Sequence, residues 1–281
     1  MIPTIPGLAI TLLLISALVS ALLALSVVGR RTYRIQTARR KLAREKRVRP
    51  LLIDILDGNG NFVLGRRDRA TLVLLAANMA GKIRGDSRKV LTNWLTEEGF
   101  ARACLKKMKS PFTLTRARAL DRFAPIADHA PRSIERMLDD KDQGVRNLAA
   151  RIAGLSAAVA LAPALLRRVE GPRPIPARII SMAVLRSAPS TIFDFGDTLV
   201  DRHDRVRALA IDLAGQLSLV DARNAIEAGL RSDSAAVRAA SLRSINRIGS
   251  PSSLPALERM DTYSPQEYSS RLAAIHELRG A

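Results

Sequence analysis

Residues 233–257 read DSAAVRAASLRSINRIGSPSSLPAL, and this stretch decides the fold. Asp233 lies just before a segment with the apolar spacing of a helix, where a carboxylate accepts the free N–H groups of a helix start. Gly249 and Pro251 then mark the end of one helix and the beginning of the next. The stretch therefore predicts two helices that are joined by a short turn.

The Val237-Arg238 pair of this stretch recurs along the chain. Val145-Arg146 and Val206-Arg207 also open helical segments, and weaker counterparts lack the Val. The arginines of the series lie 28 to 33 residues apart, and they are Arg88, Arg116, Arg146, Arg178, Arg207, Arg238 and Arg271. A fixed period of this length is typical of repeat proteins, in which each repeat is one small structural unit.

Positions after each arginine also share properties. Three places on, six of the seven copies have a small residue: Ala119, Ala149, Ser181, Ala210, Ser241 and Ala274. We expect these small residues where neighbouring helices cross closely. Four places on, the residues are apolar and form a predicted buried column: Leu120, Ala150, Met182, Ile211, Leu242 and Ile275.

The next position, five places after the arginine, is mainly polar and marks the predicted solvent face of these helices. Its charged or titratable members are Asp121, Arg151, Asp212, Arg243 and His276. We take these five residues as the candidate interaction face. Its charges have mixed signs, which argues against a continuous contact with a phosphate backbone.

The repeated pattern of a loop Asp, Val-Arg, small and aliphatic residues and Leu-Gly resembles the HEAT repeat, in its short bacterial form (HEAT-like or phycobilisome-lyase-type). The resemblance is firm over 140–257 and extends over 66–281. It implies an all-α fold, an α-solenoid of about seven helix pairs that presents a surface to protein partners. It also implies that Arg146, Arg207 and Arg238 are structural, because Asp and Arg of successive HEAT repeats form a ladder.

The residues before the repeats are strongly apolar. Residues 7–28 form a run of 22 with no charged side chain. As a helix, at about 1.5 Å per residue, this run would be roughly 33 Å long, which is enough to cross a bilayer. The alternatives are a cleaved signal peptide, which lacks its basic first segment here, and a buried core helix. We therefore expect a transmembrane anchor over 1–29.

A basic segment follows the apolar run and sets the expected orientation. Residues 30–49 carry ten cations and one acid, and the cations begin with Arg30, Arg31, Arg34, Arg39, Arg40 and Lys41. Cations that flank a span stay in the cytoplasm. We expect a single-pass inner-membrane protein with its N-terminus outside, a basic juxtamembrane helix and linker over 30–65 that contacts anionic lipids, and a cytoplasmic solenoid over 66–281. A nucleic-acid arm is the alternative, but only Tyr33 offers stacking.

Composition excludes several classes of site. The 281 residues contain one Cys and three His, which excludes a disulfide framework and makes a Cys/His metal site unlikely. The formal net charge is +19, yet the chain shows no sequence-specific DNA-binding motif. No segment alternates apolar and polar residues with period two, so we expect no sheet.

Three small motifs invite a chemical interpretation, and each has a simpler one. Asp194-Phe195-Gly196 matches the metal-binding tripeptide of protein kinases, but the other kinase motifs are missing and Phe193 and Phe195 are better explained as core residues. Asp201, His203 and Asp204 form a polar cluster that fits a loop and helix cap better than a metal site. Cys104 lies among apolar residues and is predicted to be a buried thiol. We therefore expect no enzyme, cofactor or metal.

These observations favour a membrane-anchored adaptor that presents its solenoid to protein partners. The HEAT-like resemblance implies a membrane enzyme such as a glycosyltransferase as one candidate partner. The alternatives are a lyase-type enzyme, as the resemblance to the phycobilisome-lyase repeats implies, and a lipid- or nucleic-acid-binding protein that works through charge alone.

Overall fold

The computed structural model describes residues 5–155 and 159–280. Over these residues every regular element is a helix and no strand is present, so the predicted all-α class is confirmed. Two compact units are distinguished, one formed by 1–79 with 84–94 and the other by 80–83 with 95–281.

The first unit contains one long helix and three shorter ones. They are α1 (Ile5–Val48), α2 (Leu51–Leu56), α3 (Arg66–Ala80) and most of α4 (Asp86–Glu97). A loop at Gly60 closes against α4, where Trp94 donates its indole N–H to the Gly60 carbonyl at 3.1 Å. A side chain at Gly60 would collide with this indole, since an added Cβ would lie 2.7 Å from Trp94 Cδ1.

The predicted membrane anchor is not supported, and the predicted inner-membrane location is wrong. Among the described residues, no helix is both long and apolar enough to span a bilayer. The apolar run is the first half of one longer helix, because α1 has 44 residues and ends at Val48. The second half of α1 carries nine of the cations. The side chains of 7–12, 14, 15, 19 and 21, which belong to the predicted span, lie outside the described residues. The predicted orientation depended on the anchor and is not supported either, and the predicted lipid contact and membrane-enzyme partner are likewise unsupported.

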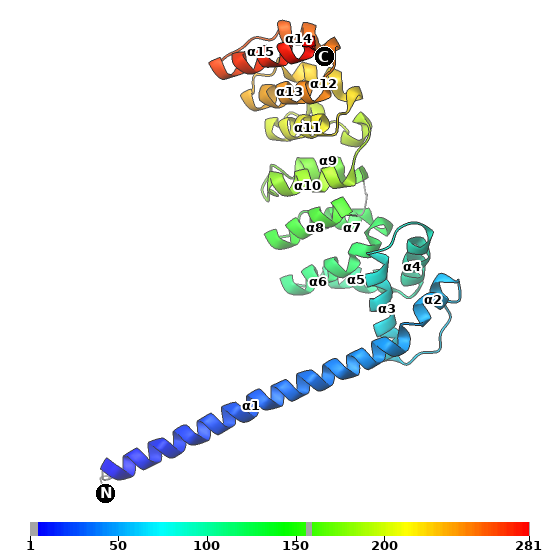
Figure 1. The fold of residues 1–281 in the computed structure, drawn as a ribbon, viewed down its shortest axis with the longest axis vertical. Coiled ribbons are helices and arrows are strands. Elements are labelled where there is room, and N and C mark those ends of the chain that lie inside the picture. Colours follow the sequence, from blue (N-terminus) through cyan, green and yellow to red (C-terminus); the bar gives the residue numbers. More distant parts are fainter. Residues whose placement is uncertain (1–4, 156–158, 281) are drawn as a thin grey trace. The chain divides into compact units, whose positions relative to one another are not determined.

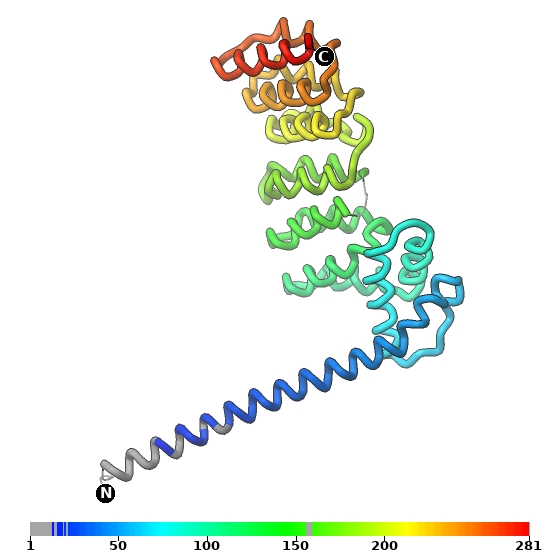
Figure 2. Tube along the Cα trace, in the orientation of Figure 1, coloured from blue at the N-terminus to red at the C-terminus, as the bar shows by residue number. Residues whose placement is uncertain are grey.

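The second unit is a stack of helix pairs (Figure 1). The pairs are α5 (Phe100–Met108) with α6 (Thr113–Phe123), α7 (Pro131–Met137) with α8 (Gln143–Leu155), α9 (Ala162–Arg167) with α10 (Ala177–Ser187), α12 (Arg223–Gly229) with α13 (Ala235–Ile248), and α14 (Leu254–Glu258) with α15 (Pro265–Gly280). Figure 2 follows the chain from each pair into the next. Short 3₁₀ turns lead into several helices, namely η1 (Ala124–His129), η2 (Val159–Leu161), η5 (Val220–Ala222) and η6 (Pro251–Ser253).

One helix of the stack lacks a full partner helix. Helix α11 (Asp204–Gln216) has no full helix before it, and two 3₁₀ turns, η3 (Ile192–Phe195) and η4 (Thr198–Val200), take that place. The Asp194 carboxylate and the Thr191 side chain form a capping box that starts η3, so Asp194 of the kinase-like tripeptide is a turn residue. Of the two predicted core aromatics, Phe195 is fully buried, but Phe193 is 87% exposed.

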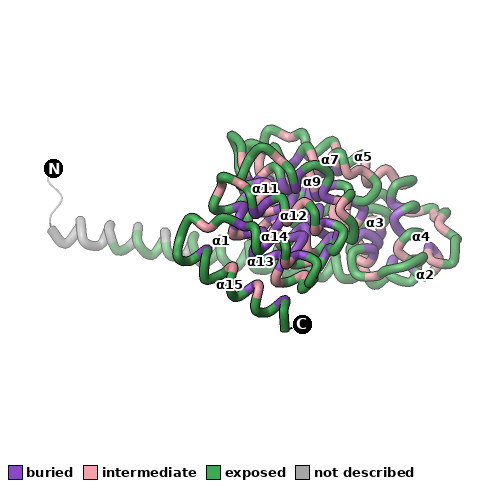
Figure 3. Tube along the Cα trace, turned by 90° about the horizontal axis from the view of Figure 1, so that it is seen from above, coloured by how far each residue is buried: buried purple, intermediate pink, exposed green. Residues whose placement is uncertain are grey.

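The second helices of the pairs pack against one another along the stack, and the buried residues gather along this packing (Figure 3). Of the six small residues of the repeat, Ala119, Ala149, Ala210, Ser241 and Ala274 are buried as predicted, whereas Ser181 is only half-buried. The predicted apolar column is buried at Leu120, Ala150, Ile211 and Leu242, whereas Ile275 is half-buried. Met182 is 58% exposed, and it lies on α10, the helix before the broken pair.

Two glycines explain how closely the second helices approach. A Cβ at Gly154 of α8 would lie 2.6 Å from the Ala183 carbonyl oxygen of α10. A Cβ at Gly215 of α11 would lie 2.6 Å from Ser244 Cα of α13. Real side chains do not fit at these distances, so the Gly of the repeat motif allows one backbone to rest on the next.

Candidate functional site

Two arginines of the repeat series, Arg116 and Arg238, each bind both a carboxylate and two backbone carbonyls, and in this way they connect loops of the stack. Arg116 and Arg238 are each 5% exposed. Arg116 donates to both carboxylate oxygens of Asp140 at 2.8 Å, and Arg238 donates to Glu267 Oε1 at 3.1 and 2.7 Å. Each guanidinium also donates to two carbonyls of the loop before its own helix, as Arg238 does to Ser232 and Asp233. These arginines therefore join one pair to the next.

The carboxylates of these ties are stabilised in their charged form. Burial would raise the pKa of Asp140, but the hydrogen bonds from Arg116 and the Asp142 backbone hold it below its ordinary value. The backbone N–H of Tyr263 lowers the pKa of Glu267, and Arg238 lowers it further against the opposing effect of burial. Arg238 also lies 4.4 Å from the centre of the Tyr263 ring.

The remaining arginines of the series are tied less completely. Arg146 is buried and donates to the carbonyls of Asp140 and Lys141 at 2.9 and 3.2 Å, but its Nε has no partner. Arg207 is half-buried and Arg178 exposed, and neither makes a side-chain hydrogen bond within the described part of the chain. Arg146 and Arg238 are thus buried and hold loops as predicted, but neither pairs with an Asp side chain within the described residues, so the predicted Asp–Arg ladder does not run through them. Arg207 departs from the predicted structural role beside the broken pair.

The candidate interaction face lies on five second helices, α6, α8, α11, α13 and α15. Its members are exposed, except that Asp212 is half-buried. The structure brings two of them together, because Arg243 donates to Asp212 at 3.2 Å across neighbouring helices. Arg247 and Gln216 also donate to this carboxylate, at 3.0 and 2.8 Å. Burial would raise the pKa of Asp212, but these donors keep it below its ordinary value.

The other members of the face stay apart from this cluster. Asp121, Arg151 and His276 form no side-chain hydrogen bond or ion pair within the residues that the structure describes. These three side chains therefore remain available to a partner, whereas the Asp212–Arg243 pair is partly satisfied within the stack. Neither residue pattern nor period could have shown this difference, because it depends on Arg247 and Gln216 reaching the same carboxylate.

The six predicted basic residues lie exposed on α1. Lys41 approaches Glu45 at 3.7 Å, which is an exposed contact between neighbouring turns. Arg30, Arg31, Arg34, Arg39 and Arg40 make no ion pair with any described residue. The second half of α1 thus has a cationic surface.

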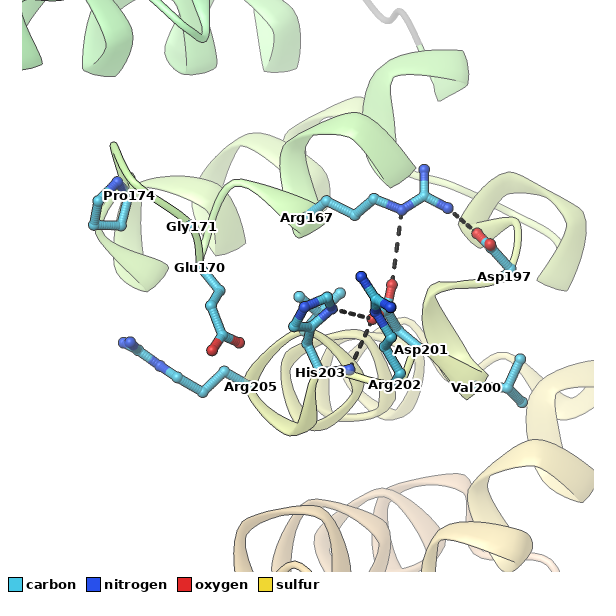
Figure 4. A pocket seen from close by; sticks show the side chains of 11 residues that line it. Arg167, Glu170, Gly171, Pro174, Asp197, Val200, Asp201, Arg202, His203 and Arg205 are labelled. Carbon is cyan, nitrogen blue, oxygen red and sulfur yellow. Dashed lines mark hydrogen bonds and ion pairs between the residues drawn. The ribbon is translucent and has the colours of Figure 1, made fainter.

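A cleft opens beside the broken pair, and the sequence pattern had not indicated it. It has a volume of about 1030 Å³ and is lined by the loop after α9, by η4 and by the beginning of α11 (Figure 4). The lining residues are Arg167, Glu170, Gly171, Pro174, Asp197, Val200, Asp201, Arg202, His203, Arg205 and Val206. They come from two segments that lie some 30 residues apart in the sequence.

Part of the charge in the cleft is already paired. Figure 4 shows Arg167 reaching both Asp197, as an ion pair, and Asp201, at 3.7 Å. Asp201 also accepts from the His203 backbone N–H at 2.9 Å and faces its ring Nδ1 at 2.9 Å. Burial would raise the pKa of Asp201, but these contacts with His203 and the charge of Arg167 hold it low. A carboxylate only accepts, so Nδ1 carries the hydrogen in this pair.

The structure thus brings together two of the three polar residues noted at 201–204. Asp204 begins α11 and is exposed outside the cleft lining. Over the described residues, no group of three or more His, Cys, Asp or Glu side chains is placed to hold a metal ion. Cys104 is 5% exposed, as predicted, and burial raises the pKa of its thiol.

The repeat geometry agrees with a comparison against known families. Residues 195–279 match the family model described as HEAT repeats. This part of the chain is therefore similar to HEAT repeats. The matched segment covers α11 to α15 and contains the cleft's Asp197–Val206 side together with three members of the candidate interaction face. No curated protein matches the sequence.

Several solved structures are similar to the chain at low identity. YibA of E. coli is 16% identical over 77% of this chain and 89% of its own, with a TM-score of 0.39. A chain of the CpcE–CpcF complex of phycocyanin lyase from Nostoc sp. is 17% identical over 72% and 94%, with a TM-score of 0.31. An engineered protein is 16% identical over 82% and 96%, with a TM-score of 0.32.

Proposed function

We propose that this HEAT-like protein is a non-catalytic scaffold that binds protein partners along the exposed face of its second helices. The observation that carries the proposal is the position of Asp121, Arg151, Asp212, Arg243 and His276 on the second helices of five pairs. Stacked helix pairs create extended binding surfaces, because each pair adds a strip of similar geometry. HEAT repeats generally bind proteins, which supports this class of partner.

In-cell photo-crosslinking tests this proposal. A photoreactive amino acid replaces Arg151, Arg243 or His276, one at a time. Matched controls carry it at two exposed arginines of the first-helix side, Arg132 on α7 and Arg259 directly after α14. We expect the same discrete protein adduct from the three face positions and none from the controls. The proposal would be contradicted by equal adducts from the first-helix and second-helix positions, or by the absence of an adduct from all three face positions.

Salt dependence separates this function from charge-driven binding. A partner held by shape and specific contacts should remain bound as salt rises. Binding to a polyanion through charge alone should weaken steeply, with log affinity falling linearly against log salt. The partner that crosslinking identifies is then co-purified with the protein without crosslinking. The measurement is the amount of partner recovered at each of a series of salt concentrations.

A further inference from the structure

We propose that a groove along α5 binds an acidic segment of a protein partner. The groove has a volume of about 530 Å³ and is lined by the end of α4, the turn at Gly99 and one face of α5. Because it lies on a first helix, this binding site is separate from the second-helix face of the proposed function and goes beyond it.

The charged side chains that line the groove are three cations and one carboxylate. The cations are Arg102, Lys106 and Lys109, and the carboxylate is Glu97. All four are exposed, and none of their side chains makes a hydrogen bond or ion pair within the part of the chain that the structure describes. The lining therefore carries a net charge of +2, and its cations are free to bind an anion.

The three cations lie on one side of α5. They are separated by four and three residues, the spacing that makes residues neighbours on a helix surface. At about 1.5 Å per residue they span roughly 10 Å along the helix axis. An extended segment of about four residues has the same length, so a few successive acidic residues of a partner can meet all three cations.

The position of Arg102 is not explained by the stability of the helix. Helix α5 begins at Phe100, so Arg102 lies in the first turn, which contains no acidic residue. The positive end of the helix dipole disfavours a cation there, whereas it favours Lys106 and Lys109 at the opposite end of the helix. A bound carboxylate would compensate the charge of Arg102, which lacks a side-chain partner among the described residues.

The rest of the lining favours a protein segment over a single-stranded nucleic acid. The groove has no aromatic residue among the described residues that line it, and single strands are usually bound by stacking of bases on aromatic rings. Ala101 and Leu105 line the groove beside the cations and are half-buried, so they offer an apolar surface to an aliphatic side chain. Guanidinium groups bind carboxylates through paired, charge-assisted hydrogen bonds. An acidic segment that includes an aliphatic residue matches both parts of the lining.

Fluorescence anisotropy with the full chain tests this assignment. The probe is a short labelled peptide of Glu and Asp with one central Leu. A second peptide has Gln and Asn in place of every acid, and a labelled oligothymidylate carries the same number of negative charges as the probe. The groove variant is Arg102→Glu/Lys106→Glu, and Arg102→Gln/Lys106→Gln removes the charges without reversing them. The matched control is Arg178→Glu/Arg231→Glu, which makes the same change of charge at two exposed arginines without side-chain partners in the described part of the stack.

We expect the acidic peptide to bind the unaltered chain, and the groove variant to bind it at least about tenfold more weakly. The Gln/Gln variant should bind it severalfold more weakly, and the control within about threefold of the unaltered chain. Circular dichroism checks that the variants keep their helices.

The proposal would be overturned by absence of binding, by an equal loss in the control, or by equally tight binding of the Gln and Asn peptide. Tighter binding of the oligothymidylate that is lost in the groove variant would also overturn it and assign the groove to nucleic acid. Crosslinking at Arg151, Arg243 and His276 does not involve these side chains, so it shows separately whether the scaffold function fails.

Discussion

At the residue scale, Arg238 shows how much one guanidinium holds in place. It donates to Glu267 and to the carbonyls of Ser232 and Asp233 while only 5% exposed. Arg238→Ala removes four hydrogen bonds and leaves the Glu267 carboxylate buried, with the Tyr263 N–H as its one remaining donor among the described residues. We expect the free energy of unfolding to fall by about 3 kcal/mol, since loss of one partner of a buried ion pair is costly. Urea unfolding followed by circular dichroism measures this.

The control for this substitution is Arg178→Ala. Arg178 occupies the same repeat position but is exposed and makes no side-chain hydrogen bond in the described part of the chain. Its substitution should change the free energy of unfolding by no more than about 0.5 kcal/mol. Equal losses for the two variants would show that the buried ties do not stabilise the stack.

The same ties predict a dependence of stability on pH. The native pKa of Asp140 and that of Glu267 lie below their ordinary values. The unfolded chain therefore takes up protons first as the pH falls, and the stabilisation is complete only above the unfolded-state pKa of about 4. We expect stability to decline as the pH falls from about 5 through the native pKa values. Arg116→Ala should flatten the part of this decline that belongs to Asp140, and an unchanged slope would contradict the assignment.

At the element scale, the close contacts at Gly154 and Gly215 fix the spacing of the second helices. Gly154→Ala places a Cβ 2.6 Å from the Ala183 carbonyl, and backbone cannot move aside as a flexible side chain can. We expect a loss of about 1–3 kcal/mol in the free energy of unfolding, in spite of the better helix propensity of Ala. Gly29→Ala is the matched control, because nothing lies within 4 Å of a Cβ there. A neutral Gly154→Ala would mean that α8 and α10 are less tightly packed than the structure shows.

The elements also show which features the sequence could predict. Features that recur in every repeat can be recognised from the sequence. Helix pairs and their contact faces were predicted in this way, from the period of the arginines, the small residues and the Gly residues of α8 and α11. The cleft could not be predicted in this way, because it arises from what Arg178 and Arg207 fail to contact and from the shortening of a helix into η3 and η4. Met182 and Phe193 were expected in the core and are exposed in this same irregular part. The anchor prediction depended on the apolar run at 7–28, but among the described residues no helix is both long and apolar enough to span a bilayer.

At the scale of the whole molecule, the stability of a stack of helix pairs is approximately the sum of contributions from each pair and from the interfaces between neighbouring pairs. Each pair contacts mainly the next one, so a local defect should spread to adjacent pairs and fade beyond them. Arg238 joins α13 to the first turn of α15 through Glu267, and Arg238→Ala should therefore raise amide hydrogen exchange in α12 to α15. The first pairs of the stack, α5 to α8, should keep their exchange rates, since Arg116 and Asp140 hold them independently. Hydrogen exchange resolved by mass spectrometry tests this, and a uniform rise across the stack would show a single cooperative unit instead. The interruption at η3 and η4 lies between the two regions, so it is also where we expect the change in exchange to end.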